Sequence, residues 1–148
     1  MSVLLRAYRD EDFDIVTRLW RRARLQAFPD FEARHAHTYA EDRDYFRDKI
    51  LPGNQVFVAE LDGRLAGFMA QRGDFIDQLY VDPDFQRRGL GTAFLALARR
   101  LSPASLYLYT LQVNSGGRHF YEKSGFHIAK LGVSPPPESE PDVQYRWP

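Results

Sequence analysis

The residues with the clearest capacity for chemistry lie in one short segment that follows a predicted strand. The segment runs Gln86-Arg87-Arg88-Gly89-Leu90-Gly91-Thr92 and leads directly into a helical pattern. The first amides of a helix lack internal partners and lie at the positive end of the helix dipole. Gly89 and Gly91 carry no side chain to keep an anion away, so the segment predicts a phosphate or diphosphate site. The alternative is a plain turn between a strand and a helix.

Two familiar phosphate loops do not match this segment. A Walker loop needs Gly-Lys followed by Ser or Thr, whereas this chain has Gly91–Thr92 and no lysine there. A dinucleotide fingerprint needs a third glycine and an acidic residue about 20 residues further on. Phe94 occupies the glycine position, and the later stretch is Leu108–Val113. Both alternatives are therefore excluded.

Two motifs in register resemble the GNAT N-acetyltransferase superfamily. The first is Gln86-x-x-Gly89-x-Gly91 after a strand that ends Leu79-Tyr80-Val81-Asp82-Pro83, which is similar to the family's acetyl-CoA signature. The second is Asn114 followed by Phe120-Tyr121-Glu122-Lys123-Ser124-Gly125-Phe126. The resemblance covers Gln55–Leu131 and implies acetyl-CoA as the acetyl-donor cosubstrate.

The resemblance also implies contacts with that cosubstrate. The backbone at Leu79, Tyr80 and Val81 would pair with the pantetheine arm as if it were an extra strand, and Asn114 would reach the arm from the neighbouring strand. The sheet would splay between these strands. The diphosphate would be held at Gln86 and by the amides of the residues that follow it, Arg87, Arg88, Gly89, Leu90, Gly91 and Thr92. For Asn114, the alternative is an ordinary turn residue.

Acetyl transfer to an amine needs a proton for the departing thiolate, and Tyr121 is the candidate general acid. The resemblance places Tyr121 near the thioester sulfur, and a phenol with a pKa near 10 suits this role. The alternative is a core aromatic residue. Because the chain has no cysteine, direct attack within a ternary complex is the simplest route.

The general base is less clearly marked. Asp77 lies four residues before Val81, where some family members have a glutamate, and an ordinary ion-paired carboxylate is an equal alternative. Alternation places Asp77, Leu79 and Val81 on one strand face unless a bulge intervenes. The other candidates are Glu60, His35, His37 and deprotonation by solvent.

Gly117 departs from the family pattern, which often has alanine in this short helix. Because glycine costs up to about 1 kcal/mol in a helix interior, we expect the helix to start late.

These residues need a framework of alternating elements. Asp10 and Pro29 would bound the first helix, Asp62–Gly63 predicts a tight hairpin, and prolines from Pro135 to Pro141 predict a stiff loop outside any ladder. The expected helices are Phe13–Ala27, Ala40–Ile50, Gly91–Leu101 and Gly117–Ser124, with an irregular segment at Asp30–His37. The expected strands are Val3–Ala7, Gln55–Leu61, Arg64–Gln71, Phe75–Val81, Ser105–Val113, Phe126–Leu131 and Val143–Trp147. The fold class is α/β, with a mixed and mostly antiparallel sheet flanked by helices.

Composition predicts one domain over residues 1–148. The chain has 20 Lys and Arg against 20 Asp and Glu, so it does not favour a nucleic-acid or membrane binder. Without cysteine there is no disulfide or thiolate zinc site, and no metal is predicted.

We expect a cytoplasmic protein that acetylates a primary amine of a small molecule or peptide. A non-catalytic acyl-CoA-binding module and a nucleotide-binding regulator are the alternatives. It would be a monomer or a homodimer paired through an edge strand at Val143–Trp147.

Overall fold

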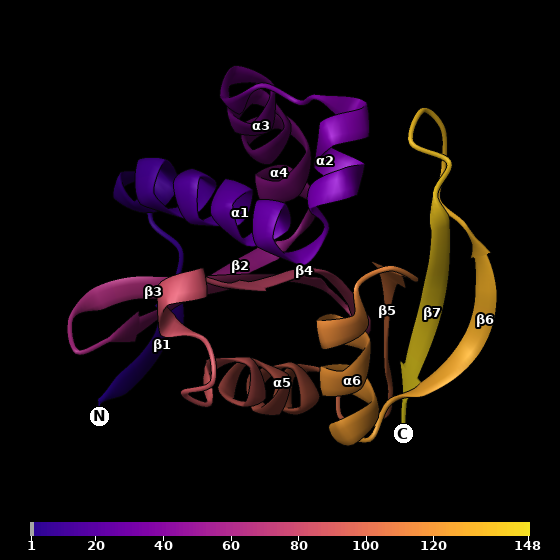
Figure 1. The fold of residues 1–148 in the computed structure, drawn as a ribbon. Coiled ribbons are helices and arrows are strands. Elements are labelled where there is room, and N and C mark those ends of the chain that lie inside the picture. The colour runs from indigo at the N-terminus through magenta and orange to yellow at the C-terminus, as the bar shows by residue number, and fades with distance from the viewer. Residues whose placement is uncertain (1) are drawn as a thin grey trace.

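The protein is a seven-stranded mixed sheet with helices on both faces (Figure 1). A computed structural model describes residues 2–148. The strand order is β1-β2-β3-β4-β5-β7-β6, and every neighbouring pair is antiparallel except β4 and β5. The strands are β1 Val3–Ala7, β2 Gln55–Leu61, β3 Arg64–Arg72, β4 Phe75–Val81, β5 Leu106–Leu111, β6 His127–Val133 and β7 Pro141–Trp147. The expected fold class is confirmed.

The helices form two layers, with α1 to α4 on one face of the sheet and α5 and α6 on the other (Figure 1). They are α1 Phe13–Ala27, α2 Pro29–His35, α3 Tyr39–Tyr45, α4 Leu51–Gly53, α5 Leu90–Leu101 and α6 Ser115–Lys123. A π-helical turn, Phe46–Ile50, joins α3 to α4. Each layer buries its own apolar cluster against the sheet, one around Trp20, Phe46 and Phe68 and the other around Phe94 and Tyr145. Within residues 2–148, no helix has the length and apolar character needed to span a membrane.

The two ends of the first helix differ from the prediction, at Asp10 and at Pro29. Asp10 opens a 3₁₀ turn, but the carboxylate of Asp12 accepts the amide of Arg9, at 2.8 Å, and pairs with Arg6. The expected cap at Asp10 is therefore wrong. Pro29 ends α1 as predicted and also begins α2, because its fixed φ and missing N–H suit a first helical position. The expectation of an irregular segment at Asp30–His37 is wrong for this reason.

The strands of the central hairpin confirm the predicted turn. Asp62 and Gly63 both have positive φ, 51° and 82°, as a two-residue hairpin turn requires. Thus β2 and β3 pair along their whole length.

The C-terminal strand is not an edge. Strand β7 lies between β5 and β6, so the predicted edge at Val143–Trp147 is wrong, and β6 forms the free edge instead. Pro141 was expected to stay outside the ladder, yet it is the first residue of β7 and pairs with Val133. A strand's first position tolerates proline because no amide is needed from it there.

Candidate active site

The segment between β4 and α5 presents unpartnered amides. Gly89 precedes α5 in the left-handed region, with φ of 83°, and Arg87 is also left-handed, with φ of 62°. Within the described chain, the amides of Leu90, Gly91 and Thr92 donate to no backbone carbonyl. Three free donors at the start of a helix are the geometry that the predicted anion site requires.

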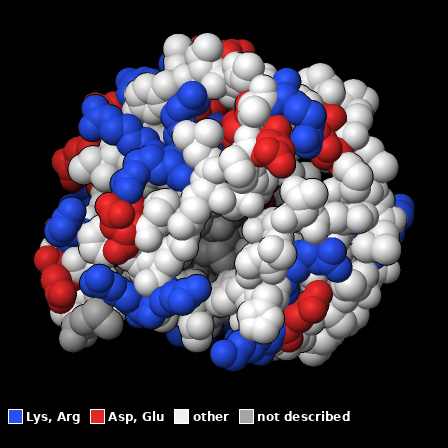
Figure 2. Space-filling view, viewed as in Figure 1, with Lys and Arg blue, Asp and Glu red and all other residues white. Residues whose placement is uncertain are grey.

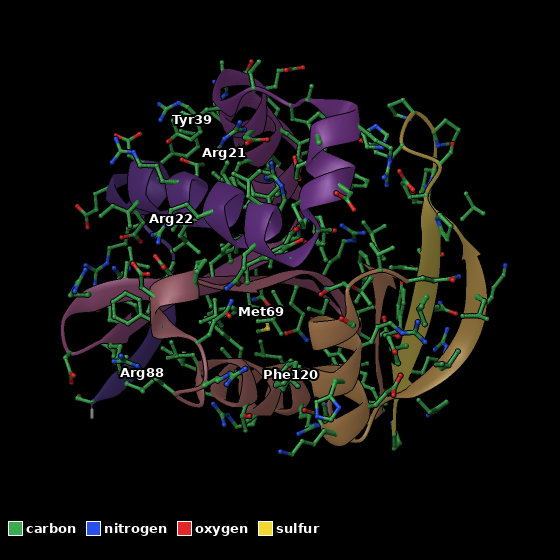
Figure 3. The ribbon with its side chains drawn as sticks, viewed as in Figure 1. Arg21, Arg22, Tyr39, Met69, Arg88 and Phe120 are labelled. Carbon is green, nitrogen blue, oxygen red and sulfur yellow. The ribbon has the colours of Figure 1, made fainter. Side chains whose placement is uncertain are left out.

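The two glycines of this segment serve different purposes. A Cβ at Gly89 would meet nothing within 4 Å, so crowding does not require glycine here. The left-handed φ is what favours glycine at this position. A Cβ at Gly91 would lie 2.9 Å from the ring of Phe120, which projects from α6 towards α5 (Figure 3). Gly91 therefore allows the close approach of the two helices.

Helix α1 holds the same segment from the other side. Arg22 donates to Asp82 and Asp84, both at 3.0 Å, and Gln86 donates to Gln26 at 2.8 Å. In Figure 2 basic side chains gather beside a hollow on this face, and Figure 3 shows Arg22 and Arg88 on that side of the molecule. The anion site thus has a fixed frame and a basic border.

Strands β4 and β5 separate after a single pair. Phe75 lies opposite Tyr107, and no later residue of β4 pairs with β5 within the described chain. The β4 edge from Ile76 to Val81 therefore carries backbone groups that β5 does not bind. A cavity of about 50 Å³ lies in this gap, and Leu79, Asn114 and Tyr121 are among its lining residues.

Tyr121 is buried, with 8% of its surface exposed, and its ring packs against Phe126 and Tyr145. Its hydroxyl has no hydrogen-bond partner among residues 2–148, and the residue lines the cavity between β4 and β5. Burial raises the pKa of Tyr121 above its usual value, and the nearby phenol of Tyr80 adds to this. The neutral phenol is the favoured form, which is the form that can donate a proton.

Asn114 caps α6. Its side-chain oxygen accepts the amide of Gly117 at 3.1 Å, and its nitrogen donates to Thr110 at 3.0 Å. The expected late start of this helix is wrong, since α6 begins at Ser115. A Cβ at Gly117 would collide with the Asn114 side chain, so the glycine is what allows the cap to close.

A bulge at Asp77 changes the predicted face of β4. Gln78 pairs with Ala70 and Ile76 pairs with Gln71, so Asp77 is the extra residue. The carboxylate of Asp77 accepts a hydrogen bond from Asn54, at 2.9 Å, just after α4.

Leu79 and Val81 pack against the cluster on the α5 side. Asp77 therefore does not share their face, because the bulge that the prediction allowed as an exception is present.

A second cavity, of about 1040 Å³, lies between the α1–α3 layer and the sheet. It shares with the smaller cavity a set of lining residues, Asp77, Gln78, Tyr80, Tyr109 and Thr110. Burial raises the pKa of Tyr80 to about 12. The gap between β4 and β5 is therefore adjacent to a much larger chamber, and these shared residues form the boundary between the two cavities.

Aromatic and charged side chains form the chamber wall. Trp20, Phe28 and Phe31 line it, and Arg24 stacks 4.2 Å from the centre of the Trp20 ring. Arg24 also binds Glu32 and Asp42, each at 2.8 Å.

Of the three side chains predicted as alternative bases, only one histidine lines the chamber. His37 lines it, whereas His35 binds Glu140 at 3.2 Å beside it. Glu60 pairs with Arg6 and lines neither cavity. Sequence reasoning missed Asn54, Tyr45 and Asp142, because no local motif marks them.

The comparisons with known proteins agree with this geometry. A family model described as an acetyltransferase (GNAT) domain matches residues 52–128. The chain belongs to the GNAT acetyltransferase family. Peptidyl-lysine N-acetyltransferase YiaC of Escherichia coli strain K12 is 29% identical over 126 residues, covering 84% of each chain. Peptidyl-lysine N-acetyltransferase YjaB of Salmonella typhimurium strain LT2 is 29% identical over 129 residues, covering 86% of each chain.

Solved structures show the same GNAT fold. The apo form of YjaB from Escherichia coli has a TM-score of 0.84 at 24% identity, covering 99% of this chain and 98% of that one. PaiA N-acetyltransferase from Thermoplasma acidophilum, in complex with coenzyme A, has a TM-score of 0.72 at 19% identity, covering 99% of each chain. Membership of the GNAT family supports acetyl-CoA as the cosubstrate. The free amides at the start of α5 are chemically suited to its diphosphate, and the unpaired β4 edge is suited to its amide-bearing arm.

Proposed function

We propose that the protein transfers an acetyl group from acetyl-CoA to a primary amine by direct attack in a ternary complex. The observation that carries the proposal is the junction of two cavities at Asp77 and Tyr80. The gap between β4 and β5 suits the donor, and the larger chamber suits the acceptor. When bound, acetyl-CoA would supply an activated acetyl thioester and then a thiolate that needs a proton.

The chain's own residues would hold the reactants and move the protons. The amides of Leu90, Gly91 and Thr92 would bind the diphosphate, and Asn114 would border the arm. Tyr121 would donate its phenolic proton to the leaving sulfur. Burial keeps the phenol neutral, which is the protonation state that donation requires.

Asp77 would accept a proton from the attacking amine, directly or through a water molecule. Asn54 holds its carboxylate at the bulge, where it lines both cavities. The carboxylate therefore lies on the boundary that an amine must reach from the chamber. An amine attacks only when neutral, so a base at this position would help to prepare it.

The acceptor we favour is an aliphatic primary amine such as a lysine side chain. The aromatic wall at Trp20, Phe28 and Phe31 would pack against an alkyl stem. Two relatives of 29% identity are named peptidyl-lysine N-acetyltransferases, which supports lysine as the first acceptor to test.

The test is release of free thiol from acetyl-CoA in the presence of amines, with the acetylated product identified by mass spectrometry. The amines are a lysine-containing peptide, Nα-acetyl-lysine and simple alkylamines. Amine-dependent thiol release is the expected result. Binding of acetyl-CoA without acetylation of any amine would overturn the proposal and favour a non-catalytic acyl-CoA-binding module.

A further inference from the structure

The acceptor chamber contains one mostly buried carboxylate that has no bound partner among the described residues. Asp142, the second residue of β7, has 8% of its surface exposed and lines the chamber. Its main-chain carbonyl accepts a hydrogen bond from Gln112, but its side chain takes part in no hydrogen bond or ion pair within residues 2–148. Burial raises the pKa of Asp142 above its usual value. A cation that entered the chamber would gain a charge-assisted hydrogen bond from this carboxylate.

The surroundings of Asp142 leave room for that partner. Gly132 lies opposite it on β6, and a Cβ there would come 3.1 Å from the carboxylate. Lys130 also lines the chamber and its charge lowers the pKa of Asp142, but its side chain is exposed and forms no ion pair with Asp142 within the described residues. The carboxylate is therefore open on the chamber side and bordered by a residue without a side chain.

The other carboxylates of the chamber divide into two groups. Glu32 and Asp42 are bound by Arg24, and Glu41 accepts the backbone amide of Thr38. These three are satisfied within the protein.

Asp77 and Glu138 face the chamber with no arginine or lysine bound to them. Both carboxylates, after burial itself, help to raise the pKa of the Tyr45 phenol, so they act on the same part of the chamber. His37 lies 3.7 Å from Glu138. With Asp142, the chamber has more negative charge than its own cations balance.

Asp142 and Asp77 lie on different strands, with β5 between them. Asp142 lies opposite Leu111 on β5, and Phe75 of β4 lies opposite Tyr107. In a regular sheet, two residues of strand rise and two strand spacings would separate such backbones by about 12 Å, and the splay of β4 from β5 widens this gap. Each carboxylate can therefore bind a different nitrogen of one acceptor through its own charge-assisted hydrogen bond of about 2.8 Å.

We propose that Asp142 binds a second cationic nitrogen of the acceptor, at the end of the chamber away from the reacting amine. The preferred acceptors are then alkyl chains with two ammonium groups, such as a diamine or a lysine whose α-amino group is free. This inference rests on the proposed acetyl transfer and names its substrate class.

The test compares two acceptors that differ only in the distal charge, 1,5-diaminopentane and pentylamine. Because hydrogen bonds to charged groups are strong, kcat/KM should favour the diamine by about tenfold or more. Asp142→Asn should reduce the diamine to the level of pentylamine, mainly through KM, and should leave pentylamine within about twofold. A contact made equally in the ground state and the transition state changes KM and spares kcat.

Two further variants separate recognition from folding and overall charge. Asp142→Asn should unfold at the same or a higher temperature, because a buried ionised carboxylate is removed. Asp44→Asn makes the same change in charge at an exposed position on α3 and should retain the preference for the diamine. Lysine and Nα-acetyl-lysine, compared in the same way, show whether a free α-amino group can supply the second charge.

Equal kcat/KM for diamine and pentylamine, or an equal loss for both in Asp142→Asn, would overturn the inference and leave acetyl transfer intact. Acetylation of a lysine peptide without acetylation of either simple amine would do the same. Absence of amine-dependent thiol release with every acceptor would overturn the proposed function itself.

Discussion

Tyr121 carries the clearest prediction at the scale of a single residue. Tyr121→Phe removes only the hydroxyl from a buried ring, so packing against Phe126 and Tyr145 remains. Positioned general acids contribute about 10²–10⁴-fold, and we expect kcat to fall by that factor. The dissociation constant for acetyl-CoA, measured by calorimetry, should change little. An unchanged kcat would remove Tyr121 from the mechanism.

The ionisation of Tyr121 gives a second test at this scale. Burial disfavours the charged phenolate, so its pKa lies above the usual value near 10 and the proton is retained to higher pH. The difference in phenolate absorbance between the wild type and Tyr121→Phe should therefore not change as the pH is raised to 10. A difference that titrates below pH 10 would show that Tyr121 is solvated.

The roles of some residues could be predicted from their type and their sequence neighbours, and the roles of others depend on long-range contacts. Gly89 was predicted as part of an anion site because it has no side chain to shield the first amides of a helix, whereas its left-handed φ is seen only in the structure. For Asn114 the sequence allowed two roles, contact with the cosubstrate or an ordinary turn residue. The face of Asp77 could not be predicted, because its bulge arises from pairing with Ala70 and Gln71 on β3. Asp142 is functional in our proposal only because the fold buries it without a partner.

At the scale of elements, helix α6 depends on its cap more than on its composition. Alanine in place of a helical glycine ordinarily stabilises by up to about 1 kcal/mol. At Gly117 the new Cβ would displace Asn114, and loss of an N-cap costs about 0.5–2 kcal/mol. We expect Gly117→Ala to lower the free energy of unfolding in urea or leave it unchanged.

Gly116 is the matched control, because a Cβ there meets nothing within 4 Å. Gly116→Ala should be neutral or stabilising, and Gly117→Ala should be the less stable of the pair. The reverse order would mean that the Asn114 cap contributes little.

Element boundaries followed local signals where one signal dominated. The Asp62–Gly63 turn and the period of α1 were sufficient to place β2, β3 and α1. Pro29 was ambiguous, because proline both ends one helix and suits the first turn of the next. The acids Asp10 and Asp12 lie two residues apart, and only the position of Arg6 on β1 decides which one accepts the backbone amide.

At the scale of the whole molecule, the acceptor chamber exists because distant segments meet. Helices from the first third of the chain face β4, β5 and the β6–β7 hairpin across it (Figure 1). The insertion of β7 between β5 and β6 could not be predicted from a local pattern, since strand order depends on long-range pairing. The two motifs for binding the acetyl donor could be recognised because each lies on one continuous segment. The chamber could not be predicted, because its wall is built from α1, α2, α3 and the four strands β4 to β7.

An ionic contact between the β6–β7 loop and α2 lies beside the chamber. Glu140, at the end of the loop between β6 and β7, binds Arg34 at 2.7 Å and His35 at 3.2 Å, both on α2. His37 and Glu138 approach each other nearby, at 3.7 Å. Arg34 and His35 together lower the pKa of Glu140, with the Arg34 hydrogen bond as the largest cause, so Glu140 remains charged at neutral pH.

Glu140→Gln should loosen this contact without unfolding the protein. Partly exposed ion pairs contribute little to global stability, so the melting temperature should be nearly unchanged. Amide hydrogen exchange should increase in α2 and in residues 134–140, and stay constant in β2 and β3, which pair along their whole length. KM for the amine should change, while the dissociation constant for acetyl-CoA stays within about twofold, because the contact borders only the acceptor side.

Asp44→Asn is again the control for charge. Faster exchange throughout the sheet would instead identify Glu140 as a determinant of overall stability, and an altered affinity for acetyl-CoA alone would contradict the assignment of this side to the acceptor.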